Sequence, residues 1–116
     1  MTTMRYGAGA QANTPIKTTT VVLGSASANG DMTLSDSLSN YQFVGIATYF
    51  SDAINSFDIY PVSFFKNPTM PIYIRYDTNN SYRHVQLAYS SDTVITISNR
   101  TNLNVQIIGI KLGGAF

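Results

Sequence analysis

The segment Ile72–Asn99, IYIRYDTNNSYRHVQLAYSSDTVITISN, decides the fold of this chain. In it, runs of β-branched and aromatic residues alternate apolar with polar positions, and the turn-forming stretches Thr78–Ser81 and Ser91-Asp92 separate these runs. Such alternation over about four to eight residues is typical of a strand with one buried face, and Asn, Asp and Ser favour turns. The segment therefore predicts the strands Ile72–Asp77, Tyr82–Ser90 and Thr93–Asn99.

The same pattern continues on both sides of this segment. Short β-branched and aromatic runs recur at intervals of roughly 8–12 residues, which is typical of β-sandwiches, and the spacing of apolar residues favours no long helix. The further predicted strands are Thr18–Leu23, Met32–Leu34, Gln42–Phe50, Phe57–Phe65 and Leu103–Leu112. We therefore expect an all-β protein, an antiparallel, jelly-roll-like β-sandwich of about eight strands.

The length and the first residues predict the domain organisation. The 116 residues suit one domain, because domains cluster at roughly 100–150 residues. Met1–Lys17 has no hydrophobic period and is expected to be an extended N-terminal arm or linker, either a flexible tail or a docking arm toward a larger assembly. Residues 18–116 are expected to form the β-sandwich head. The N-terminal residues do not resemble a secretory signal, and no apolar run has the roughly 18–20 residues of a membrane span.

The composition favours binding over catalysis. Charged residues make up 11% of the chain, Glu and Cys are absent, and His84 is the only histidine. Acid–base chemistry would therefore fall on His84 or on Asp residues, and the sequence contains no nucleophile-elbow, phosphate-loop or zinc-protease motif. We expect no enzymatic activity, no cofactor and no metal. The net charge of +1 comes from scattered residues, so nucleic-acid binding is not expected. Membrane insertion is not expected either, because no apolar run is long enough to span a membrane.

Three predicted strands carry apolar residues on both faces. In Gln42–Phe50, Val44 and Ile46 alternate with Phe43 and Tyr49, so this strand is expected to lie between two partner strands. In Leu103–Leu112 the apolar residues change faces midway, which predicts either a bulge or a second buried surface. Phe57–Phe65 behaves likewise around Pro61, with Phe57 and Ile59 on one face and Val62 and Phe64 on the other, and the proline restricts this strand to a sheet edge or a bulge.

These extra apolar faces predict self-association. One small sandwich has one interior, and a large exposed apolar patch is costly for a soluble monomer. We therefore expect a homo-oligomer; the alternative is an unusually apolar monomer whose strands change sheet at each irregularity. The expected interface residues are Phe43, Tyr49, Ile108, Ile110 and Leu112.

The predicted hairpin around Thr78–Ser81 provides the candidate binding surface. A four-residue turn there pairs Asp77 with Tyr82, Arg75 with His84 and Tyr73 with Gln86 on one face, while the core face carries Ile72, Ile74, Tyr76, Val85, Leu87 and Tyr89. Aromatic rings cover the apolar faces of sugars, and Arg, Asp, His and Gln bond hydroxyls. The expected receptor contacts are Tyr73, Arg75, Asp77, Tyr82, His84 and Gln86, with Asn79 and Asn80 of the turn. This face could equally be solvated or contact another subunit.

Loops and local corners add further predictions. The loops Ser51–Ser56, Lys66–Thr69 and Thr78–Ser81 are the second recognition candidate, because loops on rigid sandwiches commonly carry binding residues. The Ser- and Asn-rich stretch Ser35–Tyr41 predicts a tight corner at the start of the most apolar strand. Gly109, among branched residues, predicts the close approach of a backbone or a bulky side chain.

Three segments carry a resemblance to a known family. LGSAS at Leu23–Ser27, MTLSDSLSNY at Met32–Tyr41 and VQIIGIKL at Val105–Leu112 resemble the C-terminal receptor-binding domains of tail-fibre and baseplate proteins of tailed phages, and the resemblance covers Thr18–Leu112. It implies a homotrimeric β-sandwich tip that attaches the virion to a host cell-surface glycan or outer-membrane protein. Such a protein is made in the host cytoplasm and resides in the tail fibre or baseplate of the virion.

Two alternatives to this function remain. One is a structural virion protein, a decoration or fibre-assembly subunit that docks on other virion proteins, with the arm Met1–Lys17 as the contact. The other is a cellular carbohydrate-binding module.

Overall fold

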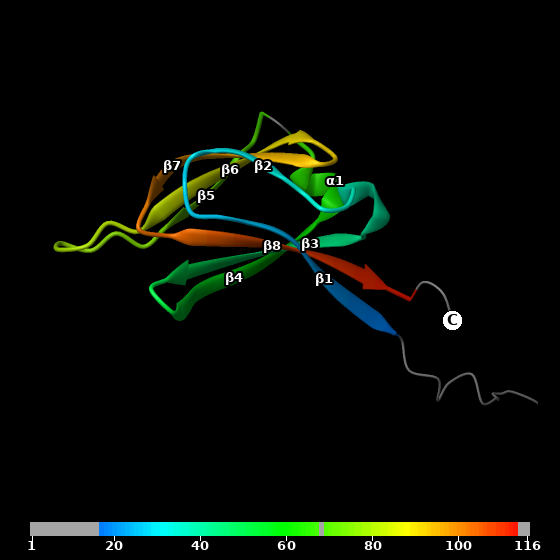
Figure 1. Cartoon of the computed structure of the whole chain (residues 1–116), viewed down its shortest axis with the longest axis horizontal. Helices are drawn as coiled ribbons and strands as arrows, with labels where there is room; N and C mark the ends of the chain where they lie inside the picture. Colours follow the sequence, from blue (N-terminus) through cyan, green and yellow to red (C-terminus); the bar gives the residue numbers. More distant parts are fainter. Residues whose placement is uncertain (1–16, 68, 114–116) are drawn as a thin grey trace, which may run out of the picture.

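Eight strands build two antiparallel sheets packed face to face in the computed structural model, which describes residues 17–67 and 69–113 (Figure 1). The β3 sheet has the order β1 (Thr18–Ala26), β8 (Asn104–Leu112), β3 (Phe43–Phe50) and β4 (Ala53–Pro61). The β6 sheet has the order β2 (Gly30–Thr33), β7 (Val94–Thr101), β6 (His84–Ser91) and β5 (Ile72–Arg75). The predicted all-β sandwich is therefore confirmed. The nested pairs β1–β8 and β2–β7 resemble jelly-roll winding, whereas β3–β4 and β5–β6–β7 are hairpin-connected.

The core lies between the two sheets and is built from aliphatic side chains. Inward-facing residues of both sheets form one cluster, because alternate residues of a strand point to the same face. Its fully buried members include Leu23, Val44, Ile46, Val85, Leu87, Ile95, Ile97, Val105 and Ile107. Burying each such side chain contributes about 1.5–3 kcal/mol, so packing alone can hold a chain that contains no cysteine.

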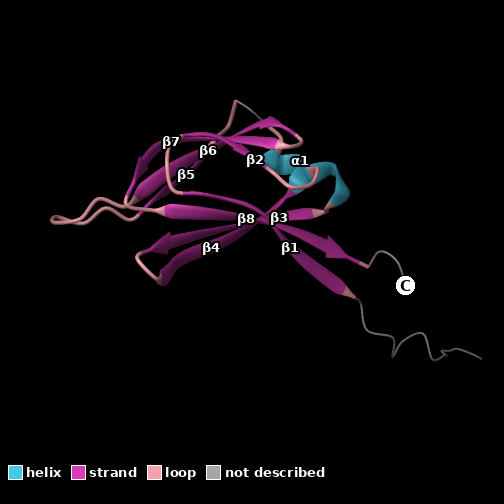
Figure 2. Cartoon of the chain, viewed as in Figure 1, coloured by secondary structure: helices cyan, strands magenta, loops and turns pink. Residues whose placement is uncertain are grey.

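The two ends of the sandwich differ. At the end where β1 begins and β8 ends, called the proximal end below, the Gly113 amide donates a 2.8 Å hydrogen bond to the Lys17 carbonyl. The short helices η2 (Leu38–Asn40) and α1 (Val62–Phe65) lie toward this end (Figure 2). The distal end carries the β3–β4 turn, the β5–β6 hairpin tip and the β7–β8 loop (Figure 1). No helix in the described ranges is long and apolar enough to cross a membrane.

The fourth predicted strand is shifted along the chain. It was expected at Phe57–Phe65, but β4 spans Ala53–Pro61, and residues 62–65 form α1. The prediction is wrong because Pro61 ends the strand instead of interrupting it: its φ of −56° suits the start of a helix. Its expected edge position is confirmed, since β4 pairs only with β3 in the described sheet. The expected loop Ser51–Ser56 shrinks to a two-residue turn, Ser51-Asp52.

Two of the three strands predicted to be apolar on both faces, β3 and β8, occupy the centre of the β3 sheet. β3 pairs with both β8 and β4, as expected. β8 is regular, and the register shift lies in its partner β1, between Val22 and Gly24. Consequently Ile108 and Ile110 share the outer face of the β3 sheet with Phe43, away from the core cluster. A second apolar surface, and not a bulge in β8, therefore explains why the apolar residues of Leu103–Leu112 change faces midway.

The predicted corner and the predicted close approach are the same contact. A Cβ atom on Gly109 would lie 2.8 Å from Cδ1 of the Tyr41 ring, so the glycine makes room for that ring. Tyr41 is held by its hydroxyl, which donates to Asp36 Oδ2 at 2.9 Å. Asp36 Oδ1 also accepts from the Ser37 amide and from Asn40 Nδ2, both at 2.8 Å. These bonds, that from Tyr41 first, lower the pKa of the Asp36 carboxyl.

Candidate functional site

The predicted pairing of the β5–β6 hairpin is confirmed. Tyr73 lies opposite Gln86 and Arg75 opposite His84. The same register continues beyond the strands in the bridge between Thr78 and Ser81. Alternation therefore turns the side chains of this candidate face away from the core, while Ile74, Val85 and Leu87 are buried beneath it.

Asp77 organises the side chains around it. Its Oδ2 accepts from Arg75 Nε at 2.6 Å, and its Oδ1 lies 2.9 Å from His84 Nδ1 and accepts from the Arg83 amide at 2.9 Å. The hydrogen bond with His84, followed by that from Arg75, lowers the pKa of the Asp77 carboxyl. Because the carboxylate is 14% exposed and its bonds are directed to its neighbours, it positions Arg75 and His84.

Arg75 and two tyrosines present the largest exposed surfaces of this face. Tyr73 is 48% exposed and Tyr82 58% exposed. The Arg75 guanidinium carbon lies 5.9 Å from the centre of the Tyr73 ring, and the His84 ring centre lies 6.2 Å from it. Asn79 and Asn80 are exposed at the turn.

Two of the expected placements differ in detail. Gln86 is half-buried, and its Oε1 already accepts from Asn99 Nδ2 at 3.0 Å, so part of its bonding capacity is used within the sheet. Tyr76, expected on the core face, is 48% exposed because the hairpin extends past the end of the core. That expectation is wrong for Tyr76 and holds for the buried residues Ile74, Val85 and Leu87.

Contacts at its base hold the hairpin in place. Asn102, in the β7–β8 loop, donates from Nδ2 to the Tyr82 carbonyl at 2.8 Å. The Arg83 guanidinium carbon lies 3.7 Å from the centre of the Phe50 ring of β3, on the facing sheet. The hairpin is therefore joined to both sheets, and its exposed side chains have a fixed base.

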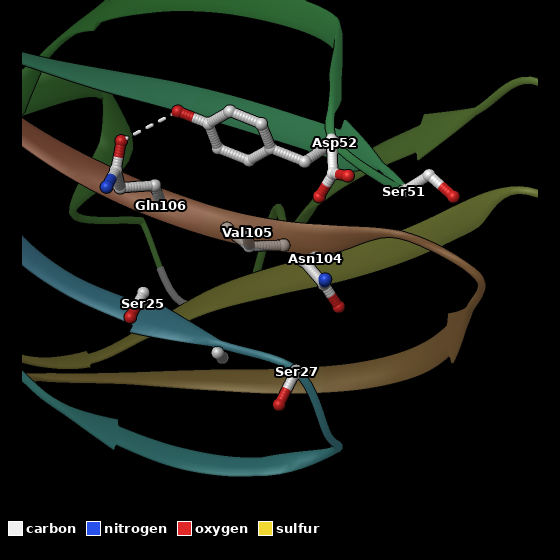
Figure 3. Close-up of a pocket in the computed structure, with 9 residues that line it drawn as sticks. Ser25, Ser27, Ser51, Asp52, Asn104, Val105 and Gln106 are labelled. Atoms are coloured by element: carbon white, nitrogen blue, oxygen red, sulfur yellow. Dashed lines mark hydrogen bonds between the residues drawn. The ribbon is translucent and has the colours of Figure 1, made fainter.

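A further candidate is a polar groove at the distal end of the outer face of the β3 sheet (Figure 3). The sequence analysis named Ser51 and Asp52 of its lining, as part of an expected recognition loop, but missed the groove itself. It measures about 470 Å³, within the range of ligand sites. Its polar lining includes Ser25, Ser27, Tyr49, Asp52, Asn104 and Gln106. The sequence did place two polar residues, Asn104 and Gln106, on the same face of β8 as Ile108 and Ile110. Locating the groove also required the register of β8 with β1 and β3, which the sequence does not give.

The outer face of the β3 sheet also holds the residues expected at a subunit interface. Phe43, Ile108, Ile110 and Leu112 share its proximal half, whereas Tyr49 lies at the groove. Ile110 is 8% exposed within one chain, so it offers little surface. The more exposed apolar residues of this face, which the sequence analysis did not select, are Val22 at 54%, Phe57 at 49%, Ile59 at 53% and Ile54 at 69%.

The other carboxylates with lowered pKa values also have local partners. Tyr89 donates to Asp92 at 2.6 Å, and Lys66 pairs with Asp92 at 2.9 Å; these two bonds, in that order, lower the pKa of Asp92.

Lys66 belongs to the expected loop Lys66–Thr69, of which Pro68 lies outside the described residues. Among the residues that the structure describes, no three His or Asp side chains gather as a metal site would require.

Comparison with known proteins adds no family assignment. No family model, no curated protein and no solved structure matches this chain.

Proposed function

We propose that this chain is the receptor-binding head of a phage tail fibre, which attaches the virion to a host cell-surface glycan or outer-membrane receptor without catalysis. The observation that supports this proposal best is the distal hairpin. Its tip, Thr78–Ser81, lies at the end of the sandwich opposite the start of β1 and the end of β8 (Figure 1), and Tyr73, Tyr82 and Arg75 are exposed on the hairpin. An attachment head needs this arrangement, because the surface that meets the cell must face away from the tail fibre that carries the head.

The chemistry of the hairpin suits recognition. Tyrosine supplies a broad, amphipathic contact at low entropic cost, and arginine bonds hydroxyl or carboxylate groups. Asp77 restrains Arg75, and Asn102 restrains the backbone at Tyr82. Less conformational freedom is therefore lost when a receptor binds, which favours affinity.

Self-association as a homotrimer is part of the proposal. Exposed Val22, Phe57 and Ile59 lie on the outer face of the β3 sheet, where water contact is unfavourable. Burying these side chains between copies would remove that cost. Three linked heads would also convert a weak single site into strong attachment, because the second and third binding events become intramolecular.

The same apolar face favours the second candidate, a structural virion protein. A decoration or fibre-assembly subunit would use Val22, Phe57 and Ile59 against other virion proteins, and its distal hairpin would not need to meet a cell. This candidate differs from the first in what the purified chain binds.

The test uses fluorescently labelled full-length chain, mixed separately with susceptible bacteria and with purified phage particles. An attachment head labels the cells and is displaced from them by unlabelled chain. Labelling of particles alone, with no displaceable binding to cells, would reject the proposal in favour of a structural subunit.

A further inference from the structure

We infer that the polar groove on the outer face of the β3 sheet binds a neutral, hydroxyl-rich saccharide. This inference rests on the proposed function, which it deepens by naming a ligand class and a second contact site. The groove lies at the distal end of the sandwich, where the β3–β4 turn contributes Ser51 and Asp52 (Figure 3). Its volume of about 470 Å³ suits one or two sugar rings.

The hydrogen bonds of the lining leave donors for a ligand. Tyr49 donates its hydroxyl hydrogen to Gln106 Oε1 at 2.8 Å, the bond drawn dashed in Figure 3. Arg100 Nη2 donates to Asn104 Oδ1 at 2.9 Å. Each amide oxygen therefore already accepts one hydrogen bond, which orients the side chain and leaves its NH₂ group as a donor. The hydroxyls of Ser25 and Ser27 can donate or accept, as sugar hydroxyls do.

The charge of the groove selects against anions. Asp52 is the charged member of the lining. Arg100 bonds Asn104 Oδ1 but is not itself a lining residue, and its Nε is buried. A carboxylate accepts hydrogen bonds from sugar hydroxyls but repels a carboxylate or phosphate on the ligand. Uronic acids, sialic acids and phosphorylated sugars are therefore disfavoured.

Tyr49 gives the groove an apolar platform. Its hydroxyl is fixed by Gln106, so the ring is held in one orientation beside the polar groups. A rigid ring covers the C–H face of a sugar with little loss of entropy. A peptide would instead be expected to use the exposed apolar residues of this face, such as Val22 and Ile59.

The experiment titrates the ¹⁵N-labelled full chain with neutral oligomers of glucose, galactose, mannose and N-acetylglucosamine, and with oligogalacturonate as the acidic probe. At least one neutral oligomer should shift the signals of Asn104, Gln106 and Asp52, and oligogalacturonate should not. Gln106→Ala and Ser27→Phe should each weaken binding at least tenfold, the first by removing a donor and the second by filling the groove. Ser27 is exposed, so the second variant leaves the core intact.

Tyr73→Ala is the matched control, because it alters the hairpin and should leave the sugar titration unchanged. Absence of groove shifts with every neutral oligomer at millimolar concentration would overturn the inference, as would stronger binding of oligogalacturonate. Cell binding without saccharide binding would overturn this inference alone. Saccharide binding in the groove without cell binding would overturn the proposed function alone.

Discussion

Single residues decide how closely parts of the sandwich approach one another. Gly109 was predicted from sequence because a glycine among branched residues marks a close contact, and Tyr41 fills that space. The role of Asp77 could not be predicted, because its bonds to Arg75 and His84 depend on how the hairpin bends beyond its paired strands. The residues flanking Gly109 were therefore enough to predict its close contact, whereas the hydrogen bonds of Asp77 could not be predicted from the sequence.

The Gly109–Tyr41 contact predicts the effect of one added methyl group. Gly109→Ala would place Cβ 2.8 Å from the Tyr41 ring, so the ring or the strand must shift. We expect a loss of about 1–3 kcal/mol in the free energy of unfolding, typical of overpacking, measured by urea denaturation. Ser27→Ala, an exposed substitution, is the control and should change stability little. An unchanged midpoint in Gly109→Ala would contradict the assigned contact.

The lowered pKa values of Asp36, Asp77 and Asp92 predict acid sensitivity. Each carboxyl binds its proton less readily in the folded chain, so its stabilising effect is full above the unfolded pKa of about 3.9 and is lost as pH falls through the lower folded value. We expect the free energy of unfolding to decrease below about pH 4.

Asp36→Asn tests the contribution of the corner. This variant should be less stable than the wild type at pH 7, because the bond from Tyr41 weakens, but its stability should fall less between pH 5 and pH 2. Urea denaturation at several pH values measures both quantities. Identical pH dependence in the two proteins would mean that Asp36 does not titrate with folding.

At the level of elements, the strands that alternate most regularly were predicted best. The β5–β6 register follows from the turn and from alternation, so the pairs Tyr73–Gln86 and Arg75–His84 were available from sequence. β4 was misplaced because a proline can either end or interrupt a strand, and spacing does not distinguish the two. The groove needed the register of β1, β8 and β3 together, and these strands are far apart in the chain.

The hairpin predicts a difference between its two faces. Tyr73→Ala and Arg75→Ala should each weaken binding of the labelled chain to susceptible cells by tenfold or more, about 1.4 kcal/mol, because they remove the exposed contacts of the candidate face. Tyr76→Ala is the matched control: Tyr76 is also 48% exposed but lies on the opposite face of the same hairpin. Equal loss in Tyr73→Ala and Tyr76→Ala would argue against a specific face.

At the scale of the whole molecule, the outer face of the β3 sheet is divided along its length. Along β8 this face is apolar proximally, with Ile108 and Ile110, and polar distally, with Asn104 and Gln106. The edge strand β4 instead carries the exposed apolar residues Ile54, Phe57 and Ile59 along its length. Sequence analysis noticed the change of face in Leu103–Leu112 but could not tell a bulge from a second surface, since both produce the same pattern. Copies can associate through Val22 and Ile59, which lie level with Ile108, while the polar distal end of β8 stays free for recognition.

This division predicts the effect of charges on assembly. The wild-type chain should have a light-scattering mass near that of three protomers, and Val22→Lys and Ile59→Lys should shift it toward one protomer, because a lysine in an apolar interface is costly. Met70→Lys, at a residue 61% exposed outside this face, should remain associated. A wild-type chain that is monomeric at micromolar concentration would refute the proposed trimer.

The most direct test of the central claim is competition for adsorption. Susceptible bacteria are first incubated with the purified full-length chain, and the fraction of phage that then adsorbs is counted. If the chain is the attachment head, adsorption should fall as its concentration rises, and Tyr73→Ala should compete at least tenfold less well. Unchanged adsorption at concentrations that saturate binding of the chain to cells would contradict the claim.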